Sequence, residues 1–336
     1  MWVARSIALV LLVASCDLPT QPPIASPSPS TAAASCRLPV WWGEATGLGV
    51  HGAFVTVPGG TVTDAGTIPQ PPQLTPTLLS SYYRGATYLA KTGTWVGVSG
   101  TVLSPGGDRM VYPTYTGPPD TYEVHLLTLA TGAERVLQRG ADQYIPIAFE
   151  ADWIYLIRPG ANVSDAPENL YRLDPAGGTP QLIKVNFRHS FPWSWTLIAD
   201  GAAWGYEIRG EDTSHHYAIL RLDLATHAVT EWFDGPVDMD LSIQGVDTRH
   251  RLYVASLDHF YRIDLPTQVS ELLDDPPVAV VGGYAPPPVL ASDSRGAWLG
   301  MSGGIRLYPL DAAPTTYAVG PPPESGAIVL PAGPCA

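Results

Sequence analysis

Two short polar segments of this sequence carry residue types that bind metal ions. His215 and His216 are adjacent, so they point to opposite sides of an extended strand and do not readily share one ion. With Asp212 and a histidine from another loop, one of them could complete a mixed site. Asp238 and Asp240 lie on one side of an extended segment and could hold Ca²⁺, although a solvated loop is the alternative. The chain contains no HExxH, CxxC or calcium-loop motif, so these residues are not assigned as metal ligands.

The three cysteines, Cys16, Cys36 and Cys335, have predicted roles other than catalysis. A disulfide between Cys36, which opens the folded region, and the penultimate residue Cys335 requires Cα atoms within about 7 Å. Such a bond persists outside the cytoplasm, and closing so long a loop contributes on the order of 4–5 kcal/mol in the chain-entropy model. Two unpaired thiols are the alternative. The sequence also lacks the GxSxG motif of a nucleophilic serine.

The N-terminal segment has the parts of a secretory signal. Arg5 precedes the apolar stretch Ile7–Val13, which is too short to span a bilayer, and small residues follow before Cys16. This arrangement resembles the lipobox of bacterial lipoproteins, which implies that residues 1–15 are a signal peptide and that Cys16 becomes the lipid-bearing N-terminus. An ordinary signal peptide is the alternative. Residues 16–35 are rich in Pro, Ser and Ala and are predicted to be a tether.

The composition limits the classes of partner. The 336 residues are 45% apolar and 15% charged, which is enough to bury a sizeable core, and the formal net charge is -13. A negative surface repels nucleic-acid phosphates and anionic lipid headgroups. We therefore expect no nucleic-acid partner, and membrane attachment only through the lipid at Cys16. The predicted location is extracytoplasmic, on the bacterial cell membrane, and the predicted state is a monomer.

Residues 36–336 have the pattern of a single all-β domain. Apolar residues recur with a period of two, in short runs separated by Gly, Pro, Asp and Asn. The chain contains 35 prolines and 33 glycines, which favour many turns. This pattern is typical of a sandwich, a barrel or a propeller.

A repeat decides among these folds. Segments such as Tyr171–Asp174 and Tyr261–Asp264 recur along the chain, each preceded by two strands around a tight turn and followed by one more. Each unit therefore has four strands, a to d. The central residues of the segments are spaced by 40, 44, 49, 41 and 44 residues, and they are Leu89, Leu129, Leu173, Leu222, Ile263 and Leu307. Propeller blades repeat with a period of about 40–50 residues.

The segment Ser104–Tyr112 resembles the strand-turn-strand motif of TolB-like, WD40-like propellers. The later repeats resemble those of quinoprotein-like and streptogramin-lyase-like propellers. The resemblance implies an all-β β-propeller. We expect six four-stranded blades, with a seventh, degenerate blade within 43–88 as the alternative. A terminal strand at 327–330 beside 38–42 would close the ring and bring Cys36 and Cys335 together.

In a propeller, the loops from strand d to the next strand a and from b to c lie on one face, which is the usual binding face of the fold. In this sequence these loops contain the densest polar and aromatic set: Arg188, His189, Trp193, Asp212, His215, His216, Asp238, Asp240, Asp258 and His259. We predict that they line a ligand pocket. The alternative is a set of solvated loops that do not converge.

The favoured function is a binding or scaffolding module for an envelope protein, a glycan or a small ligand, without a cofactor. The alternative is a metal-assisted lyase or hydrolase. Resemblance to streptogramin lyases implies a histidine and a Mg²⁺ site, for which Asp258 and His259 are the nearest candidates. The TolB-like resemblance also implies an accessory role in an envelope complex.

Overall fold

The computed structural model describes residues 35–43, 49–75, 83–117, 121–150, 152–158, 169–185, 195–209, 216–237, 241–256, 259–272, 290–319 and 328–336. All belong to the unit Ser35–Ala336, one of two into which the chain divides, the other being Met1–Ala34. The predicted signal peptide, Cys16 and the tether up to residue 34 lie outside the described residues.

The described residues are all-β. A first meander contains β1 (Cys36–Gly43), β2 (Val50–Val57) and β3 (Val62–Ile68), and a hairpin contains β4 (Thr87–Leu89) and β5 (Thr94–Val96). A 3₁₀ helix, η2 (Gly100–Val102), leads to a sheet of β6 (Arg109–Tyr115), β7 (Tyr122–Thr128) and β8 (Ala133–Gly140). No helix in the described part is long and apolar enough to cross a membrane.

Three four-stranded meanders follow. The first contains β9 (Ile145–Glu150), β10 (Trp153–Arg158), β11 (Asn169–Leu173) and β12 (Gln181–Val185). The second contains β13 (Trp195–Ala199), β14 (Ala202–Arg209), β15 (His216–Asp223) and β16 (Val229–Val237). The third contains β17 (Ser242–Val246), β18 (Leu252–Ala255), β19 (Phe260–Leu265) and β20 (Gln268–Leu272). The last strands are β21 (Leu290–Asp293), β22 (Gly296–Ser302), β23 (Gly304–Pro309), β24 (Thr315–Ala318) and β25 (Ile328–Pro331).

Burial along the strands explains the arrangement of the sheets. The second strands, such as β10 and β18, are buried along nearly their whole length, whereas the fourth strand β24 and the outer strand β8 are mostly exposed. A strand buried on both faces needs a neighbouring sheet on each side. Side chains from adjacent sheets accordingly share one core, in which Val111 and Leu126 are buried together with Phe149 and Ile154.

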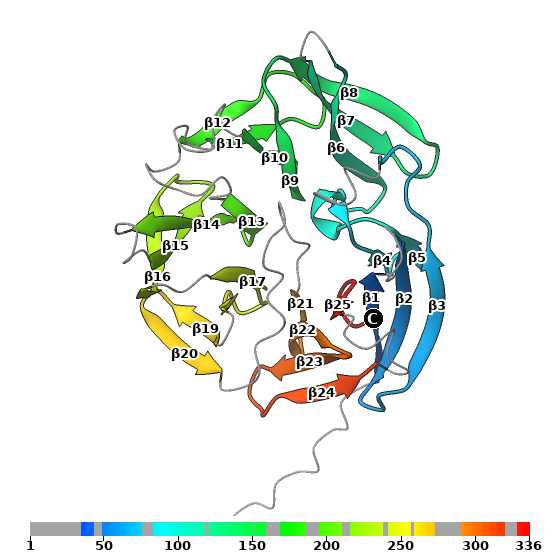
Figure 1. Cartoon of the computed structure of the whole chain (residues 1–336), viewed down its shortest axis with the longest axis vertical. Coiled ribbons are helices and arrows are strands. Elements are labelled where there is room, and N and C mark those ends of the chain that lie inside the picture. The colour runs from blue at the N-terminus through cyan, green and yellow to red at the C-terminus, as the bar shows by residue number, and fades with distance from the viewer. Residues whose placement is uncertain are drawn as a thin grey trace, which may run out of the picture. The chain divides into compact units, whose positions relative to one another are not determined.

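The first strands of successive sheets contact one another, in the order β6, β9, β13, β17 and β21. In Figure 1, β9, β13, β17 and β21 lie nearest a common centre, and β8, β20 and β24 lie on the outside. Twisted four-stranded meanders placed in this way are typical of a β-propeller. The predicted fold class is therefore confirmed at the level of an all-β, propeller-type arrangement.

The predicted turn within Ser104–Tyr112 is present. Ser104 N–H donates to Arg109 O over 2.8 Å, and Gly107 N–H donates to Ser104 O over 2.7 Å. Gly107 has φ +69°, in the left-handed region that glycine adopts at little cost. The strand before the turn is reduced to a bridge between Leu103 and Met110.

The two ends of the Ser35–Ala336 unit meet, as predicted. Strand β25 lies between β22 and β1, and Trp41 on β1 is paired with Leu330. Beyond β25, Arg37 N–H donates to Ala336 O over 2.8 Å. Cys36 and Cys335 form a disulfide with a Cα–Cα distance of 5.6 Å. The predicted cysteine pairing is therefore present.

The repeat around Leu89 differs from the other five. Within the described part of this repeat, the two strands β4 and β5 form a hairpin, whereas four strands were predicted. A proline-rich segment occupies the edge of this hairpin, where Gly97 N–H donates to Pro69 O over 3.0 Å. Because proline has no N–H, Pro69, Pro71 and Pro72 cannot continue a ladder of backbone hydrogen bonds.

Candidate functional site

Eight of the ten residues predicted to form the ligand face lie outside the described residues: Arg188, His189, Trp193, Asp212, His215, Asp238, Asp240 and Asp258. Their convergence therefore stays a prediction. The other two are described, His216 as the first residue of β15 and His259 directly before β19.

The side chain of His216 has an acidic partner within its own sheet. Its Nε2 lies 3.0 Å from Asp234 Oδ1 on the neighbouring strand β16. Arg209, at the end of β14, adds ion pairs with Glu207 and Glu231. This end of the sheet therefore carries a network of alternating charges.

His259 belongs to the turn between β18 and β19. Its N–H donates to Ser256 Oγ over 2.9 Å, and its carbonyl accepts from Ser256 N–H over 2.8 Å. Its ring lies 5.9 Å from the ring of Tyr261, centroid to centroid. In the described part of the chain, no group of three or more His, Cys, Asp or Glu side chains is placed to hold a metal ion. Ca²⁺ or Mg²⁺ at the predicted face thus remains untested.

A cavity of about 900 Å³ lies among a different set of turns. Its lining includes Ser104, Glu150 and Trp153, in turns between a first and a second strand, and Leu224 and Ala225, in a turn between a third and a fourth strand. Because antiparallel strands alternate in direction, these turns lie at the opposite end of each sheet from the loops predicted to bind ligand. The cavity was not predicted from the sequence.

Glu150 provides a carboxyl group to this cavity. It is the last residue of β9 and pairs with Trp153 across a two-residue turn. Burial, and then the charge of the nearby Asp200 carboxylate, together raise the pKa of Glu150 to about 7. Among the described residues, none donates a hydrogen bond to this carboxyl group or forms an ion pair with it. The group therefore gains or loses a proton near neutral pH.

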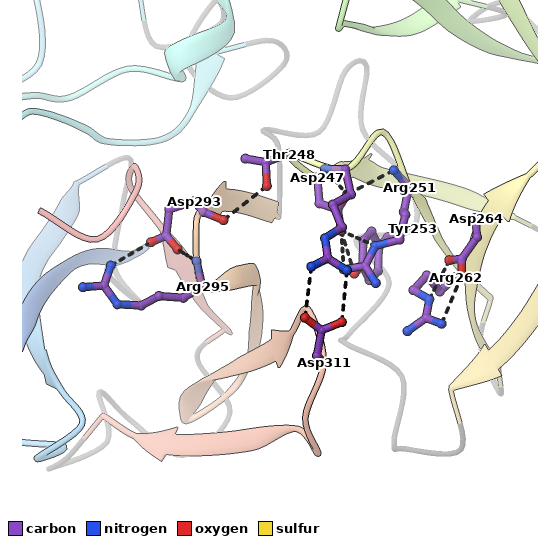
Figure 2. A network of polar contacts seen from close by, with 10 residues as sticks. Asp247, Thr248, Arg251, Tyr253, Arg262, Asp264, Asp293, Arg295 and Asp311 are labelled. Atoms are coloured by element: carbon purple, nitrogen blue, oxygen red, sulfur yellow. Dashed lines mark hydrogen bonds and ion pairs between the residues drawn. The ribbon is translucent and has the colours of Figure 1, made fainter. Parts of the chain in front are cut away.

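Other sheets have an acid at the corresponding turn, but there the carboxylate has bonding partners. Figure 2 shows Asp247, which follows β17, at the centre of such a network. Its Oδ1 accepts from the backbone N–H groups of Arg249, over 2.9 Å, and Arg251, over 3.0 Å. Its Oδ2 accepts from Arg251 Nε over 2.7 Å and from the Tyr253 hydroxyl over 3.1 Å. Both carboxylate oxygens of Asp247 thus accept hydrogen bonds from its own hairpin, and neither is left to bind a ligand.

Asp293, the last residue of β21, is bonded in the same way. It accepts from the backbone N–H of Arg295 over 2.7 Å, from Trp298 Nε1 over 3.0 Å and from Cys335 N–H over 3.1 Å (Figure 2 shows its contact with Arg295). Asp200, in the turn after β13, contacts Nδ1 of His250. Of these turn acids, only Glu150 faces a cavity without a bonding partner among the described residues.

Aromatic side chains form the wall beside Glu150. Phe149, Trp153 and Tyr155 line the cavity, and the Arg172 guanidinium lies 4.3 Å from the centroid of the Trp153 ring. Arg172 Nε also donates to Gln181 Oε1 over 3.1 Å, which fixes the guanidinium on the ring. Burial, and then the charge of Glu150, raises the pKa of Tyr155, which therefore stays protonated at neutral pH. The cavity thus combines an aromatic wall with one titratable acid.

The sequence contains a signal for this site. Acids recur at the turn between the first two strands of successive repeats, at Glu150, Asp200, Asp247 and Asp293. Glutamate replaces aspartate only at Glu150, whose side chain is one methylene longer.

Comparisons with known proteins do not assign the chain to a family. No protein-family model and no curated protein matches the chain. Prolyl oligopeptidase B from Galerina marginata is 11% identical with a TM-score of 0.43, over 84% of this chain and 40% of that one. Dipeptidyl peptidase 4 from Porphyromonas gingivalis is 15% identical with a TM-score of 0.39, over 77% of this chain and 34% of that one. Oligogalacturonate lyase from Vibrio parahaemolyticus is 10% identical with a TM-score of 0.37, over 84% and 74%.

The chain thus spans less than half the length of these peptidases. The fold and the cavity together define the class: an all-β protein of propeller type with a ligand-sized cavity at one end of its sheets.

Proposed function

We propose that this protein is a lipid-anchored, extracytoplasmic β-propeller that binds a small ligand in the cavity beside Glu150. The observation that carries the proposal is the cavity volume of about 900 Å³, which falls in the range of about 300–1,000 Å³ typical of small-molecule sites. Such sites combine apolar and aromatic walls with a few polar groups, as Trp153, Tyr155 and Glu150 do. An envelope protein or a glycan would bind at the opposite loop face, and the protein would act as a monomer.

The proposed propeller has seven positions, six occupied by sheets and one by the hairpin β4–β5. The meander of β1, β2 and β3 supports this number, since it continues from β25 within one eight-stranded sheet and precedes the hairpin along the chain. Closure of the ring would rest on β25, which pairs with β1 on one side and β22 on the other. Seven blades, the alternative count of the sequence prediction, is thus the number that we favour, and β2 and β3 lie within 43–88, where the additional blade was expected.

The cavity is tested by blocking it. We expect Ala225→Trp, on an exposed cavity turn, to fill the opening, whereas Ala176→Trp, on the equivalent turn of the preceding sheet, leaves it open. The measurement is the shift in Tm on adding neutral, cationic and anionic small molecules. A ligand at a concentration one hundred times its Kd stabilises the folded protein by about 2.7 kcal/mol. A ligand that raises the Tm of the native chain and of Ala176→Trp, but not of Ala225→Trp, supports the proposal. A ligand shift that Ala225→Trp retains would contradict it.

The lipid anchor is tested at Cys16. The Cys36–Cys335 disulfide is consistent with a location outside the cytoplasm, where such bonds persist. We expect Cys16→Ser to move the protein from the membrane fraction to the soluble fraction. Cys335→Ser is the control, because it also removes one cysteine but leaves the anchor. Membrane retention of Cys16→Ser would argue for a different attachment.

An enzymatic function is the second candidate, and the pKa of Glu150 of about 7 favours it. A carboxyl group with a pKa near the working pH is suited to general acid or base catalysis. Glu150 would transfer the proton, and Asp200 would act on its pKa. The metal-assisted alternative through Asp258 and His259 is tested separately, by adding Mg²⁺ or Ca²⁺ and measuring the Tm.

A further inference from the structure

The cavity acid lacks a counter-charge that its counterparts have. Asp247 pairs with Arg251, and Asp293 accepts from three N–H donors, whereas the carboxyl group of Glu150 has no donor among the described residues. An ionised carboxylate that is partly buried and unpaired is costly, so a ligand that supplies a positive charge gains this interaction on binding.

We infer that the ligand of this cavity is an amphiphilic organic cation, whose ammonium or guanidinium group pairs with Glu150 while its apolar body packs against Trp153 and Tyr155. The inference rests on the proposed small-ligand function and specifies its chemistry. The aromatic wall already holds one cation, the Arg172 guanidinium over Trp153, which indicates that the surroundings favour positive charge.

The charges around Glu150 favour a cation over an anion. Lys91 also lines the cavity, but it is exposed, so water screens its charge more than that of half-buried Glu150. Arg172 is already engaged by Trp153 and Gln181. Asp200 adds a second negative charge beside Glu150. An anionic ligand would have to displace these contacts and approach both carboxyl groups.

Ionisation of Glu150 then controls binding. The charged and titratable groups around Glu150 are Lys91, Arg172, Tyr155 and Asp200. Burial raises the pKa of Tyr155, so its hydroxyl keeps its proton near neutral pH. Asp200 contacts Nδ1 of His250, an imidazole whose charge would also act on this region. Cation affinity should therefore rise as Glu150 loses its proton, and the variant His250→Gln separates this effect from titration of the imidazole.

Three probes of similar size differ in charge, so they show how the charge of a ligand affects binding. They are phenethylamine, 2-phenylethanol and 3-phenylpropionate. Binding is measured by isothermal titration calorimetry on the native chain at about pH 6 and about pH 8. We expect phenethylamine to bind about tenfold more tightly at the higher pH, as the fraction of ionised Glu150 grows. The alcohol should bind weakly, with no pH dependence, and the acid most weakly of all.

The variant Glu150→Gln should lower amine affinity at pH 8 by about tenfold or more, remove its pH dependence and leave alcohol binding unchanged. Asp152→Asn, which removes an exposed acid from the same turn, should behave as the native chain, as should His250→Gln. Equal amine affinity in Glu150→Gln, or tighter binding of the acid, would overturn the cation assignment while leaving a ligand cavity. If no probe binds, and Ala225→Trp does not change the shift in Tm caused by any ligand, the proposed function itself is contradicted.

Discussion

Glu150 and Asp293 each end the first strand of a sheet, with a two-residue turn after them, yet their carboxyl groups have different surroundings. The carboxylate of Asp293 is held by N–H donors of its own turn and of the C-terminal segment. Glu150 has one more methylene, and its carboxyl group lines a cavity. Side-chain length and the presence of local donors therefore decide whether a turn acid stabilises the fold or remains available to a ligand.

The pKa of Glu150 predicts a pH-dependent effect on stability. In the unfolded chain this carboxyl group has its ordinary pKa of 4.5, and in the folded chain it has one of about 7. Between these values the folded state binds more protons, so the contribution of Glu150 to stability falls as pH rises. We expect Glu150→Gln to be more stable than the native chain at about pH 8, by about 1–3 kcal/mol, with little difference near pH 4.5.

The measurement is urea unfolding of both chains across this pH range. Asp152→Asn is the control, because this neighbouring acid is exposed and its substitution should give a difference that does not change with pH. If the difference in stability between Glu150→Gln and the native chain is the same at both ends of the range, Glu150 is well solvated in the folded state.

At the scale of elements, the hairpin stabilised by Asp247 offers a matched pair of variants, one at Asp247 and one at Asp311. Figure 2 shows both of these side chains. Asp247→Ala leaves the buried Arg251 guanidinium without its carboxylate and removes the acceptor of two turn N–H groups. We expect a loss of about 3–5 kcal/mol, as for a buried ion pair broken on one side. Asp311→Ala removes the exposed partner of Arg249 and should cost far less, because water screens this ion pair.

Chemical denaturation measures both changes, with the m-value as a check that each variant unfolds in one step. If the two variants lose similar amounts of unfolding free energy, burial of Asp247 does not increase the contribution of its ion pair and hydrogen bonds to stability. A strand pair β17–β18 that unfolds separately from the rest would indicate that this turn stabilises only its own sheet.

The strands could be predicted from sequence because their signals are local. Alternation of apolar residues and a turn between Ser104 and Arg109 require only neighbours in the chain, and the strand following each of the last five repeats was found as β8, β12, β16, β20 and β24. The reduction of the Leu89 repeat to a hairpin depends on packing against a distant proline-rich segment, and the repeat pattern could not indicate it.

The candidate site could be predicted far less well. The cavity is assembled from turns of different sheets, such as those at Ser104, Glu150 and Leu224, whose convergence depends on how the sheets pack. Sequence reasoning searched the longer loops at the other end of the sheets, because polar residues are dense there. Polar density marks exposure to water as readily as it marks a site, whereas an unpaired acid in an aromatic cavity is visible only in three dimensions.

At the scale of the whole Ser35–Ala336 unit, the first and last segments are joined twice, by hydrogen bonds and by a disulfide. Arg37 and Ala336 exchange two backbone hydrogen bonds, of 2.8 and 3.1 Å, and Ala332 N–H donates to Pro39 O over 2.9 Å. The Cys36–Cys335 bridge closes a loop with a sequence separation of 299. The pairing fixes the register of the last segment on β1, and the bridge limits how far the unfolded chain can expand.

Because the bridge acts mainly on the unfolded state, its removal should lower stability without changing the fold. We expect Cys335→Ser to reduce the free energy of unfolding by about 2–5 kcal/mol. Cys36→Ser and the double variant should lose the same amount, since each lacks the same single bond. Denaturant unfolding measures the loss, and circular dichroism checks that the strands persist. A double variant that loses the sum of the two single losses would show that the cysteines stabilise the fold through packing. Collapse of the β signal in any of them would mean that the hydrogen bonds between β1 and the C-terminal segment cannot hold the ends together without the bridge.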